Sequence, residues 1–236
     1  MGVSIVIPAY REAENLKILI PELQRVFQDV DFDINIIDTK EPLDDTETVC
    51  RNHCVGYFRR EGGNTYGDAV RTGFKVASKD RILMMDADGS HSPADARRML
   101  QDCESFDLTI GSRYIADGKT DNPGILIFMS KVVNVCFRMA LGLRVKDISD
   151  SFRVYKAADV KSLRLDCDNF DIVEEIIIKL ALSHNPYNIR EVPITFNKRM
   201  YGESKRDLVR FAFSYLQTIA RLVKIKRQAK NEAKND

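Results

Sequence analysis

The sequence has few cysteines, no tryptophan and no strong excess of either charge. Its five cysteines stand at irregular spacing without a C-x-x-C pair, which excludes a disulfide framework and a zinc ribbon and favours a reducing cytoplasm. Thirty-six basic residues against 35 acidic ones leave a formal charge of +1, too balanced for a protein that coats nucleic acid. With 236 residues, 44% of them hydrophobic, the chain can bury a core without crosslinks, which excludes disorder as its main state.

Signals for zinc, targeting and lipid attachment are also lacking. Cys50, His53 and Cys54 could share one helical face, but a zinc site needs four ligands and the other two are not evident. The sequence starts on an apolar strand without a basic leader, and Val6 stands where a myristoylation signal needs serine or threonine. We therefore expect no metal at these cysteines, no signal peptide and no lipid anchor.

Short β-rich runs alternate with helical patterns in the first half of the sequence. The predicted strands are Val3–Ile7, Ile34–Ile37, Val55–Phe58, Arg81–Met85 and Leu108–Ile110, and the predicted helices are Glu12–Phe27, Asp44–Cys54, Thr65–Ala77 and Pro93–Asp102. Ser92, Pro93 and Asp95 supply the capping hydroxyl, the first-position proline and the first-turn carboxylate of a helix start. This alternation predicts an α/β fold, a mostly parallel sheet with helices on both faces.

The second half is organised around two apolar helices. In 125–143 the polar residues Ser130, Lys131, Asn134 and Arg138 fall on one side of a helix that is otherwise apolar. They interrupt the apolar run, which excludes a helix that spans a bilayer. In 208–226 a basic face opposes an apolar one. We expect one domain over 1–225, with a nucleotide-binding half at 1–115 and an acceptor-binding half at 116–225, followed by a polar tail at 226–236.

Charge is unevenly distributed along the chain. Residues 199–236 carry ten basic and four acidic side chains, a local charge of +6 against −5 for the rest. Such a basic end suits a membrane surface, where each lysine or arginine near anionic lipid contributes roughly 1 kcal/mol, but it also suits a merely solvated helix. Nucleic acid is not expected as a partner, because the basic residues lack interleaved aromatic stacking platforms.

The sharpest chemical signal is the D-x-D motif of Asp86 and Asp88. It follows a predicted buried strand and precedes the helix that starts at Pro93, and open α/β sheets bind ligands at the carboxyl ends of their strands. Two carboxylates two residues apart in an extended segment can share one cation, and their oxygens suit Mg²⁺ or Mn²⁺, with water and a diphosphate as remaining ligands. A structural reading, with both acids as turn formers, remains open.

Two enzyme classes share this motif. It resembles the nucleophile loop of haloacid-dehalogenase-type phosphatases, but that loop usually follows the first strand, whereas three strand–helix units precede Asp86 here. The chain more closely resembles inverting glycosyltransferases of family 2, in the branch of dolichol-phosphate mannose synthase and bacterial polyprenyl-phosphate relatives. Six blocks occur in the expected order: Val6–Glu12 with Asn15 and Leu16, Gly67–Ala69 with Gly73, Asp86–Asp88 with His91, Gly111–Tyr114, Ser151–Tyr155 and Arg199–Lys205.

The resemblance implies a GT-A, Rossmann-like fold and a set of roles. Nucleotide binding would fall to Pro8, Tyr10, Glu12, Asp38 and Asp86, and metal and donor diphosphate to Asp86 and Asp88. Arg113, Arg153, Arg199 and Lys205 would contact phosphate groups, since guanidinium forks match phosphate oxygens. Glu175 matches an acidic position on the helix behind the sugar. Asp86, Asp88, Arg113 and Glu175 form the expected catalytic set.

The acceptor can be argued from chemistry. A sugar hydroxyl needs a carboxylate base, whereas a phosphate monoester is mostly dianionic at pH 7 and needs cations instead. Ser130 and Lys131, on the polar side of an apolar helix, suit a polyprenyl-phosphate acceptor, and the basic amphipathic C-terminal helix suits a membrane. Without tryptophan the chain lacks the Q-x-x-R-W signature of processive synthases, so a single transfer is expected.

One loop departs from the resemblance. The family's D-D-G-S-x-D-x-T segment reads Asp38-Thr39-Lys40-Glu41-Pro42-Leu43-Asp44-Asp45-Thr46 here, with one residue inserted and a lysine where a small residue is usual. The main hypothesis is a metal-dependent hexose transfer, from a GDP- or UDP-sugar to a polyprenyl phosphate, by a peripheral protein at the cytoplasmic membrane face. A transferase that uses Asp150, Glu174 or Glu175 as base on a sugar hydroxyl, and a degenerate, non-catalytic relative, remain alternatives.

Overall fold

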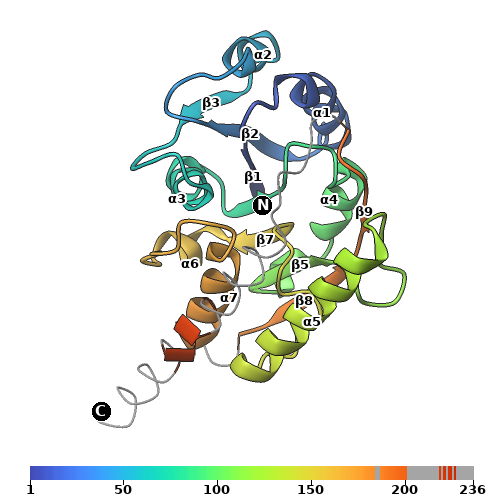
Figure 1. Ribbon diagram of the computed structural model, residues 1–236. Coiled ribbons are helices and arrows are strands. Elements are labelled where there is room, and N and C mark those ends of the chain that lie inside the picture. The colour runs from blue at the N-terminus through green and yellow to red at the C-terminus, as the bar shows by residue number, and fades with distance from the viewer. Residues whose placement is uncertain (184–186, 201–217, 219, 222, 225, 227–236) are drawn as a thin grey trace.

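A central sheet with helices on both faces organises the chain (Figure 1). The structure is a computed structural model that describes residues 1–183, 187–200, 218, 220, 221, 223, 224 and 226. The strands are β1 (Gly2–Pro8), β2 (Asp31–Asp38), β3 (Gly56–Arg59), β4 (Arg81–Met84), β5 (Leu108–Ser112), β6 (Lys119–Thr120), β7 (Arg153–Lys156), β8 (Ile189–Pro193) and β9 (Thr195–Phe196).

The sheet is mostly parallel, as the alternation predicts. Its order is β3-β2-β1-β4-β7-β5-β8, and among the strands of the described residues only β7 runs antiparallel to its neighbours β4 and β5. β6 and β9 form a separate parallel pair. Strands from both halves of the sequence therefore share one sheet.

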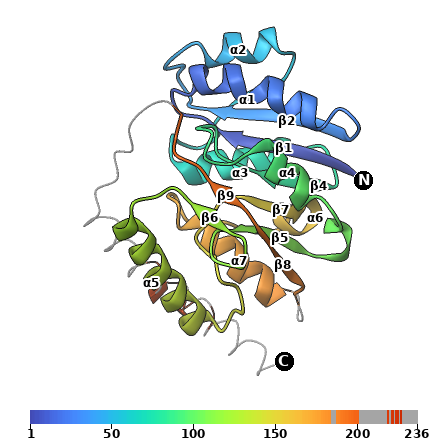
Figure 2. The same cartoon turned by 90° about the vertical axis from the view of Figure 1, so that its right-hand side faces the viewer.

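Helices cover the two faces of the sheet. They are α1 (Ala13–Val26), α2 (Thr46–Asn52), α3 (Tyr66–Val76), α4 (Pro93–Met99), α5 (Gly124–Leu141), α6 (Ala157–Lys161) and α7 (Ile172–Ser183), with a 3₁₀ turn at Cys103–Ser105. Figure 1 and Figure 2 both place α5 at the end of the molecule opposite α2.

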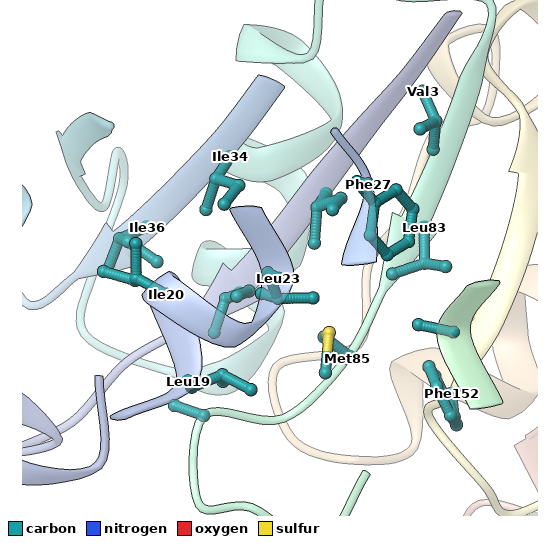
Figure 3. Packing of buried hydrophobic residues seen from close by; sticks show 14 of the residues in the cluster. Val3, Leu19, Ile20, Leu23, Phe27, Ile34, Ile36, Leu83, Met85 and Phe152 are labelled. Carbon is teal, nitrogen blue, oxygen red and sulfur yellow. The ribbon is translucent and has the colours of Figure 1, made fainter. Parts of the chain in front are cut away.

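The alternation of side chains along the strands divides the core into two clusters. Ile5 and Ile7 of β1 face a cluster that includes Leu16, Leu23 and Phe27 around α1, whereas Val6 faces a second cluster that includes residues of α3, α6 and α7. Figure 3 shows the first cluster, where α1 packs against β1, β2 and β4. Burial on both faces is what parallel strands require.

Local sequence signals fix the helix starts near the carboxyl edge of the sheet. Ser92 accepts a hydrogen bond from the backbone N–H of Asp95 at 3.0 Å, with Pro93 in the first turn, so the predicted start of α4 is confirmed. Thr65 and Asp68 form a capping box at α3, each side chain accepting a hydrogen bond from the other residue's backbone N–H. These caps satisfy backbone donors that would otherwise be left unpaired.

The second half differs most from the prediction. β7 and β8 were not expected, because β7 is four residues long and β8 lacks a regular apolar alternation. The predicted helix 125–143 is present as α5. Most of the predicted helix 208–226 lies outside the described residues, although those described from 218 to 226 are helical.

A glycine allows the segment before α7 to approach α3. A Cβ added to Gly67 would lie 2.2 Å from the carbonyl oxygen of Cys167 and 2.8 Å from Cα of Asp168. The backbone N–H of Gly67 donates to the carbonyl of Asp168 at 2.8 Å, and Arg71 donates to that of Cys167 at 2.7 Å. The contact therefore depends on the missing side chain.

Replacing Gly67 with alanine should lower the free energy of unfolding by about 1–3 kcal/mol, the usual cost of overpacking against backbone. Gly124→Ala is the matched control, because a Cβ there meets no atom within 4 Å and alanine favours a helix. Urea unfolding of both variants measures the difference. Equal stability of the two variants would contradict the contact described here.

Candidate functional site

The carboxyl ends of β1, β2 and β4 bring the predicted nucleotide and metal residues together. Pro8 ends β1, Asp38 ends β2, and Asp86 follows β4, while β1 is parallel to both neighbours. Parallel strands that end at one edge make the crevice in which α/β sheets bind ligands. Pro8, Asp38 and Asp86 therefore lie at the same edge of the sheet, and their joint role in binding a nucleotide and a metal stays a prediction.

The loop that carries Asp86 and Asp88 is held by its own hydrogen bonds. Oδ1 of Asp86 accepts from the hydroxyl of Ser151 at 3.1 Å, and Oδ1 of Asp88 accepts from the N–H of Ser90 at 3.0 Å. Gly89 has a φ of +81°, and a Cβ there would meet the side chain of Met200. The loop is thus shaped to present both carboxylates.

Charge is concentrated around these carboxylates. Burial raises the pKa of Asp86, nearby His91 lowers it and Asp88 raises it again. Burial also raises the pKa of Glu12, and both Asp88 and Asp86 add to that rise. For Asp88, burial is outweighed by the hydrogen bonds of Ser90 and by Arg199, so its pKa falls below the usual value. This negative field attracts a cation.

Arg199 supplies positive charge at this site. Its Nη2 lies 2.9 Å from Oδ2 of Asp88, and its Nη1 lies 3.5 Å from Oε1 of Glu12. The sequence predicts that Arg199 contacts phosphate, and the structure pairs its guanidinium with Asp88, one of the two predicted metal ligands, and with Glu12. Lys205, predicted for the same role, lies outside the described residues.

The donor set fits a hard divalent cation. The carboxylate oxygens of Asp86 and Asp88 are the kind of ligand that Mg²⁺ and Mn²⁺ prefer. In this structure the guanidinium of Arg199 lies beside Asp88 and supplies a positive charge where a cation would bind. Within the described part of the chain, no three or more histidine, cysteine, aspartate or glutamate side chains gather into a metal-binding cluster. A cation here would need water and a diphosphate as its other ligands.

Asp38, a predicted nucleotide-binding residue, is held by its neighbours at the end of β2. Asp38 is 1% exposed, its carboxylate accepts from the N–H of Thr39 at 2.7 Å and the hydroxyl of Tyr57 at 3.1 Å, and burial raises its pKa. Lys40 reaches across to the carbonyl of Gly62, 3.4 Å from its Nζ. Tyr10, in the loop after β1, is exposed.

Sequence reasoning missed Arg60, which braces this end. The side chain is buried, and it donates to the carbonyls of Ala9 at 2.6 Å, Asn64 at 2.7 Å and Thr65 at 3.2 Å. It thereby ties the loop after β1 to the loop after β3. An arginine at the end of a short strand gives no signal in the sequence that separates this bracing role from a surface charge.

Arg113, for which a contact with phosphate is predicted, lies between two buried carboxylates. Its guanidinium donates to both oxygens of Asp147 at 2.7 Å, and its Nε lies 3.1 Å from Oδ2 of Asp150. Burial lowers the pKa of Arg113, but the two carboxylates raise it by more. The predicted phosphate ligand is therefore already paired.

The polar face of α5 lies against this cluster. Asn134 accepts from the N–H groups of Ile148 and Ser149, at 2.7 and 3.1 Å. The hydroxyls of Ser130 and Ser149 are 3.5 Å apart, and Nζ of Lys131 lies 5.6 Å from the ring centre of Tyr114. Ser130 is therefore linked to Arg113 through Ser149, and Lys131 through the ring of Tyr114. Their role in binding an acceptor stays a prediction.

Two predicted site residues are placed elsewhere. Arg153 is 0% exposed, and its nitrogens donate to the carbonyls of Asp150, Val173 and Ile148, so its predicted contact with phosphate has no support in this structure. Glu175 is also fully buried and accepts from the N–H groups of Asp166 and Cys167. Both side chains brace α7 and its entry loop.

The fold and family can be compared with known proteins. The profile of Glycosyl transferase family 2 matches residues 4–164. A dolichol-phosphate mannosyltransferase of Pyrococcus furiosus is 33% identical over 95% of this chain, which spans only 64% of that protein. A polyprenol monophosphomannose synthase of Mycolicibacterium smegmatis is 30% identical over 85% of this chain and 79% of its own length.

An undecaprenyl-phosphate mannosyltransferase of Micrococcus luteus is also 30% identical, over 87% of each chain. Among solved structures, glucosyl-3-phosphoglycerate synthase from Mycobacterium tuberculosis, crystallised with Mn²⁺ and UDP-glucose, superposes with a TM-score of 0.72 at 17% identity, over 94% of this chain and 78% of that one. That likeness confirms the predicted GT-A fold. With the profile match and these relatives, the chain belongs to glycosyltransferase family 2.

Proposed function

We propose that the chain transfers a hexose from a nucleotide sugar to a polyprenyl phosphate at a membrane surface, with Mg²⁺ or Mn²⁺ held by Asp86 and Asp88. A phosphate oxygen of the acceptor attacks the anomeric carbon, the bond from that carbon to the diphosphate breaks, and the nucleoside diphosphate leaves with the electron pair. When bound, the cation would neutralise charge on the leaving diphosphate. The relatives act on lipid phosphates, as their names state.

The proposal depends on the protonation and the hydrogen bonds of the three carboxylates that could act as base, those of Asp150, Glu174 and Glu175. The pKa of Asp150 lies at about 2, because His91 and above all Arg113 outweigh the effect of burial. Glu175 is occupied by two backbone N–H groups. Glu174 is buried, and burial raises its pKa to about 8, so it is protonated at pH 7. A sugar hydroxyl would find no ready base here, whereas a phosphate dianion needs none.

The outer face of α5 supports attachment to a membrane. Phe128 is 65% exposed and Met139 is 81% exposed, and these two residues belong to an apolar stripe made of Ile125, Phe128, Val132, Val135 and Met139. The stripe lies opposite Asn134 and Phe137, which face the protein. Lys131 and Arg138, both exposed, flank it with positive charge. No helix in the described residues is long and apolar enough to cross a bilayer.

A direct assay tests the transfer. Labelled GDP- and UDP-sugars are incubated with Mn²⁺ and undecaprenyl phosphate, and label entering organic solvent is counted. We expect Asp86→Asn and Asp88→Asn to lose on the order of 10²-fold or more in rate, because the leaving diphosphate loses its electrostatic partner. Asp29→Asn, which removes an exposed acid paired with Arg97, should keep full activity.

The same assay separates the alternatives. Normal turnover by both Asp86→Asn and Asp88→Asn would remove the metal role. Transfer to water-soluble sugars that is indifferent to the lipid would favour the hydroxyl-acceptor enzyme. Calorimetric binding of a nucleotide without turnover of any donor would favour the degenerate relative, which the altered loop from Asp38 to Thr46 keeps in question.

A second prediction concerns Glu174. The native carboxyl keeps its proton up to about pH 8, whereas the unfolded chain loses it near 4.5, so between these values the unfolded state binds fewer protons and the free energy of unfolding falls as the pH rises. In Glu174→Gln this fall, at most about 1.4 kcal/mol per pH unit, should disappear. Urea unfolding from pH 5 to 8 measures it, with the exposed Glu14→Gln as control. An unchanged slope in Glu174→Gln would show that the carboxyl is ionised in the folded protein.

A third prediction concerns the apolar stripe of α5. The double change Phe128→Ser and Met139→Ser should weaken binding to vesicles that contain anionic lipid by at least tenfold, because each large apolar side chain contributes roughly 1.5–3 kcal/mol when fully buried. Ile18→Ser is the control, since that exposed residue lies on α1, away from α5. Vesicle co-sedimentation measures the partition. If the double variant and the control bind equally well, the stripe is not the attachment site.

A further inference from the structure

His91 is a buried histidine that the proposed chemistry does not use. It is 0% exposed, its ring stacks on Phe152 with the centres 4.4 Å apart, and the edge of Phe196 covers it at 5.4 Å. A ring clamped between two aromatic side chains has a fixed orientation. Its two nitrogens therefore face fixed partners, and those partners belong to the two sides of the candidate site.

One nitrogen faces the donor side. Nδ1 of His91 accepts a hydrogen bond from the backbone N–H of Asp86 at 3.0 Å. That N–H belongs to the residue proposed to bind the cation, so the position of the Asp86 backbone is set directly by the ring. The hydrogen bond closes the turn between Asp86 and the start of α4.

The other nitrogen faces the acceptor side. Nε2 lies 3.2 Å from Oδ1 of Asp150, close enough for strong attraction although the alignment falls short of a regular hydrogen bond. The second oxygen of Asp150 lies 3.1 Å from Nε of Arg113, and Arg113 in turn donates to Ser149 at 3.1 Å. Ser149 then contacts Asn134 and Ser130 of α5. A chain of buried polar contacts thus runs from Asp86 to α5.

We propose that His91 is a positioning residue. One ring nitrogen holds the loop that carries Asp86, the other holds the cluster of Arg113, Asp147 and Asp150, and the ring thereby fixes the position of the loop relative to the cluster. This inference rests on the proposed function, because it assigns one nitrogen to the donor and metal side and the other to the acceptor side. His91 contacts neither substrate in this arrangement and acts only through Asp86 and Asp150.

The geometry also fixes the tautomer. Burial lowers the pKa of His91, and the carboxylates of Asp86 and Asp150 raise it by more. The amide hydrogen of Asp86 nevertheless faces Nδ1, so a second hydrogen at Nδ1 would break that hydrogen bond. The ring hydrogen therefore belongs on Nε2, toward Asp150, which is the arrangement that serves both partners.

Two substitutions separate the two contacts. In His91→Asn the amide oxygen can take the place of Nδ1 and keep the hydrogen bond of Asp86, but no group takes the place of Nε2 near Asp150. In His91→Gln the amide nitrogen can take the place of Nε2 near Asp150, but the N–H of Asp86 loses its acceptor. His53→Gln, a change at the end of α2, is the matched control and should leave every constant unchanged.

The expected result is a split between kinetic constants. His91→Gln should raise the Mn²⁺ requirement and the donor KM by about fivefold to tenfold, the effect of one lost hydrogen bond, with the acceptor KM within twofold of the wild type. His91→Asn should raise the acceptor KM by a similar factor, with the donor KM and Mn²⁺ requirement unchanged. If both variants shift the same constants, or neither shifts any, His91 is not a positioning residue of this kind.

Two measurements on other properties keep the test decisive if a variant is unstable. Thermal unfolding shows whether a variant folds, and long-range ¹⁵N–¹H correlation spectra of the unmodified protein at one pH, assigned with His91→Gln or His91→Asn, show which nitrogen carries the hydrogen. A hydrogen on Nδ1 would overturn the proposal. If the wild type turns over no donor, the proposed function fails, but calorimetry of Mn²⁺ with GDP or UDP still tests the donor half of the inference on its own.

Discussion

Repulsion among buried carboxylates is the constraint that determines how the other charged side chains of the site are arranged. Asp86 and Asp88 stand beside Glu12, and Asp147 stands beside Asp150, all at or near the carboxyl edge of one sheet. Each group of carboxylates has an arginine as its partner. Arg113 lies between Asp147 and Asp150, and Arg199 lies between Asp88 and Glu12. The two arginines differ in burial, and that difference sets their roles.

The side chain of Arg113 is 9% exposed and is held by Asp147, Asp150 and Ser149. The side chain of Arg199 is 38% exposed, with ion pairs to Asp88 at 2.9 Å and Glu12 at 3.5 Å. Under the proposed function, a cation that arrives with a diphosphate would take over the carboxylate of Asp88 from Arg199 at little cost, because the guanidinium stays near water and can turn to the phosphates. Displacing Arg113 would leave Asp147 and Asp150 buried without a partner, which is far more costly. Arg113 therefore has a structural role in the site, whereas Arg199 can exchange its partners when ligands bind.

Sequence reasoning located the edge of the sheet and the acid pair because both depend on local patterns. Strand alternation, the cap at Ser92 and the spacing of Asp86 and Asp88 are all readable within ten residues of chain. The roles of Arg153 and Glu175 depend instead on what surrounds them across the fold. A guanidinium that donates to backbone carbonyls and one that donates to phosphate look alike in a sequence, and so do a carboxylate that caps a loop and one that touches a sugar.

The same reasoning explains what could be read from α5. The polar side was visible from spacing alone, since Ser130, Lys131 and Asn134 stand out in an apolar helix. The opposite side is exposed at Phe128 and Met139. This exposure depends on the position of α5 at the end of the molecule, and no local sequence pattern predicts that position. An apolar helix in a sequence is as consistent with a core as with an exposed stripe.

The altered loop after β2 keeps the acid that the resemblance assigns to nucleotide binding. Asp38 keeps its place at the end of the strand, and its carboxylate is anchored by Thr39 and Tyr57, so the acid at this edge does not depend on the small residues that the family usually has next. Lys40 instead bridges to the loop after β3 through Gly62, and the N–H of Lys40 is bound by the side chain of Asn64. The departure therefore adds polar contacts between the loop after β2 and the loop after β3. If the nucleotide binds at Asp38, as the resemblance implies, a change in this loop would alter which base fits before it altered the chemistry, because Asp86 and Asp88 lie in a different loop, after β4, with their own supports.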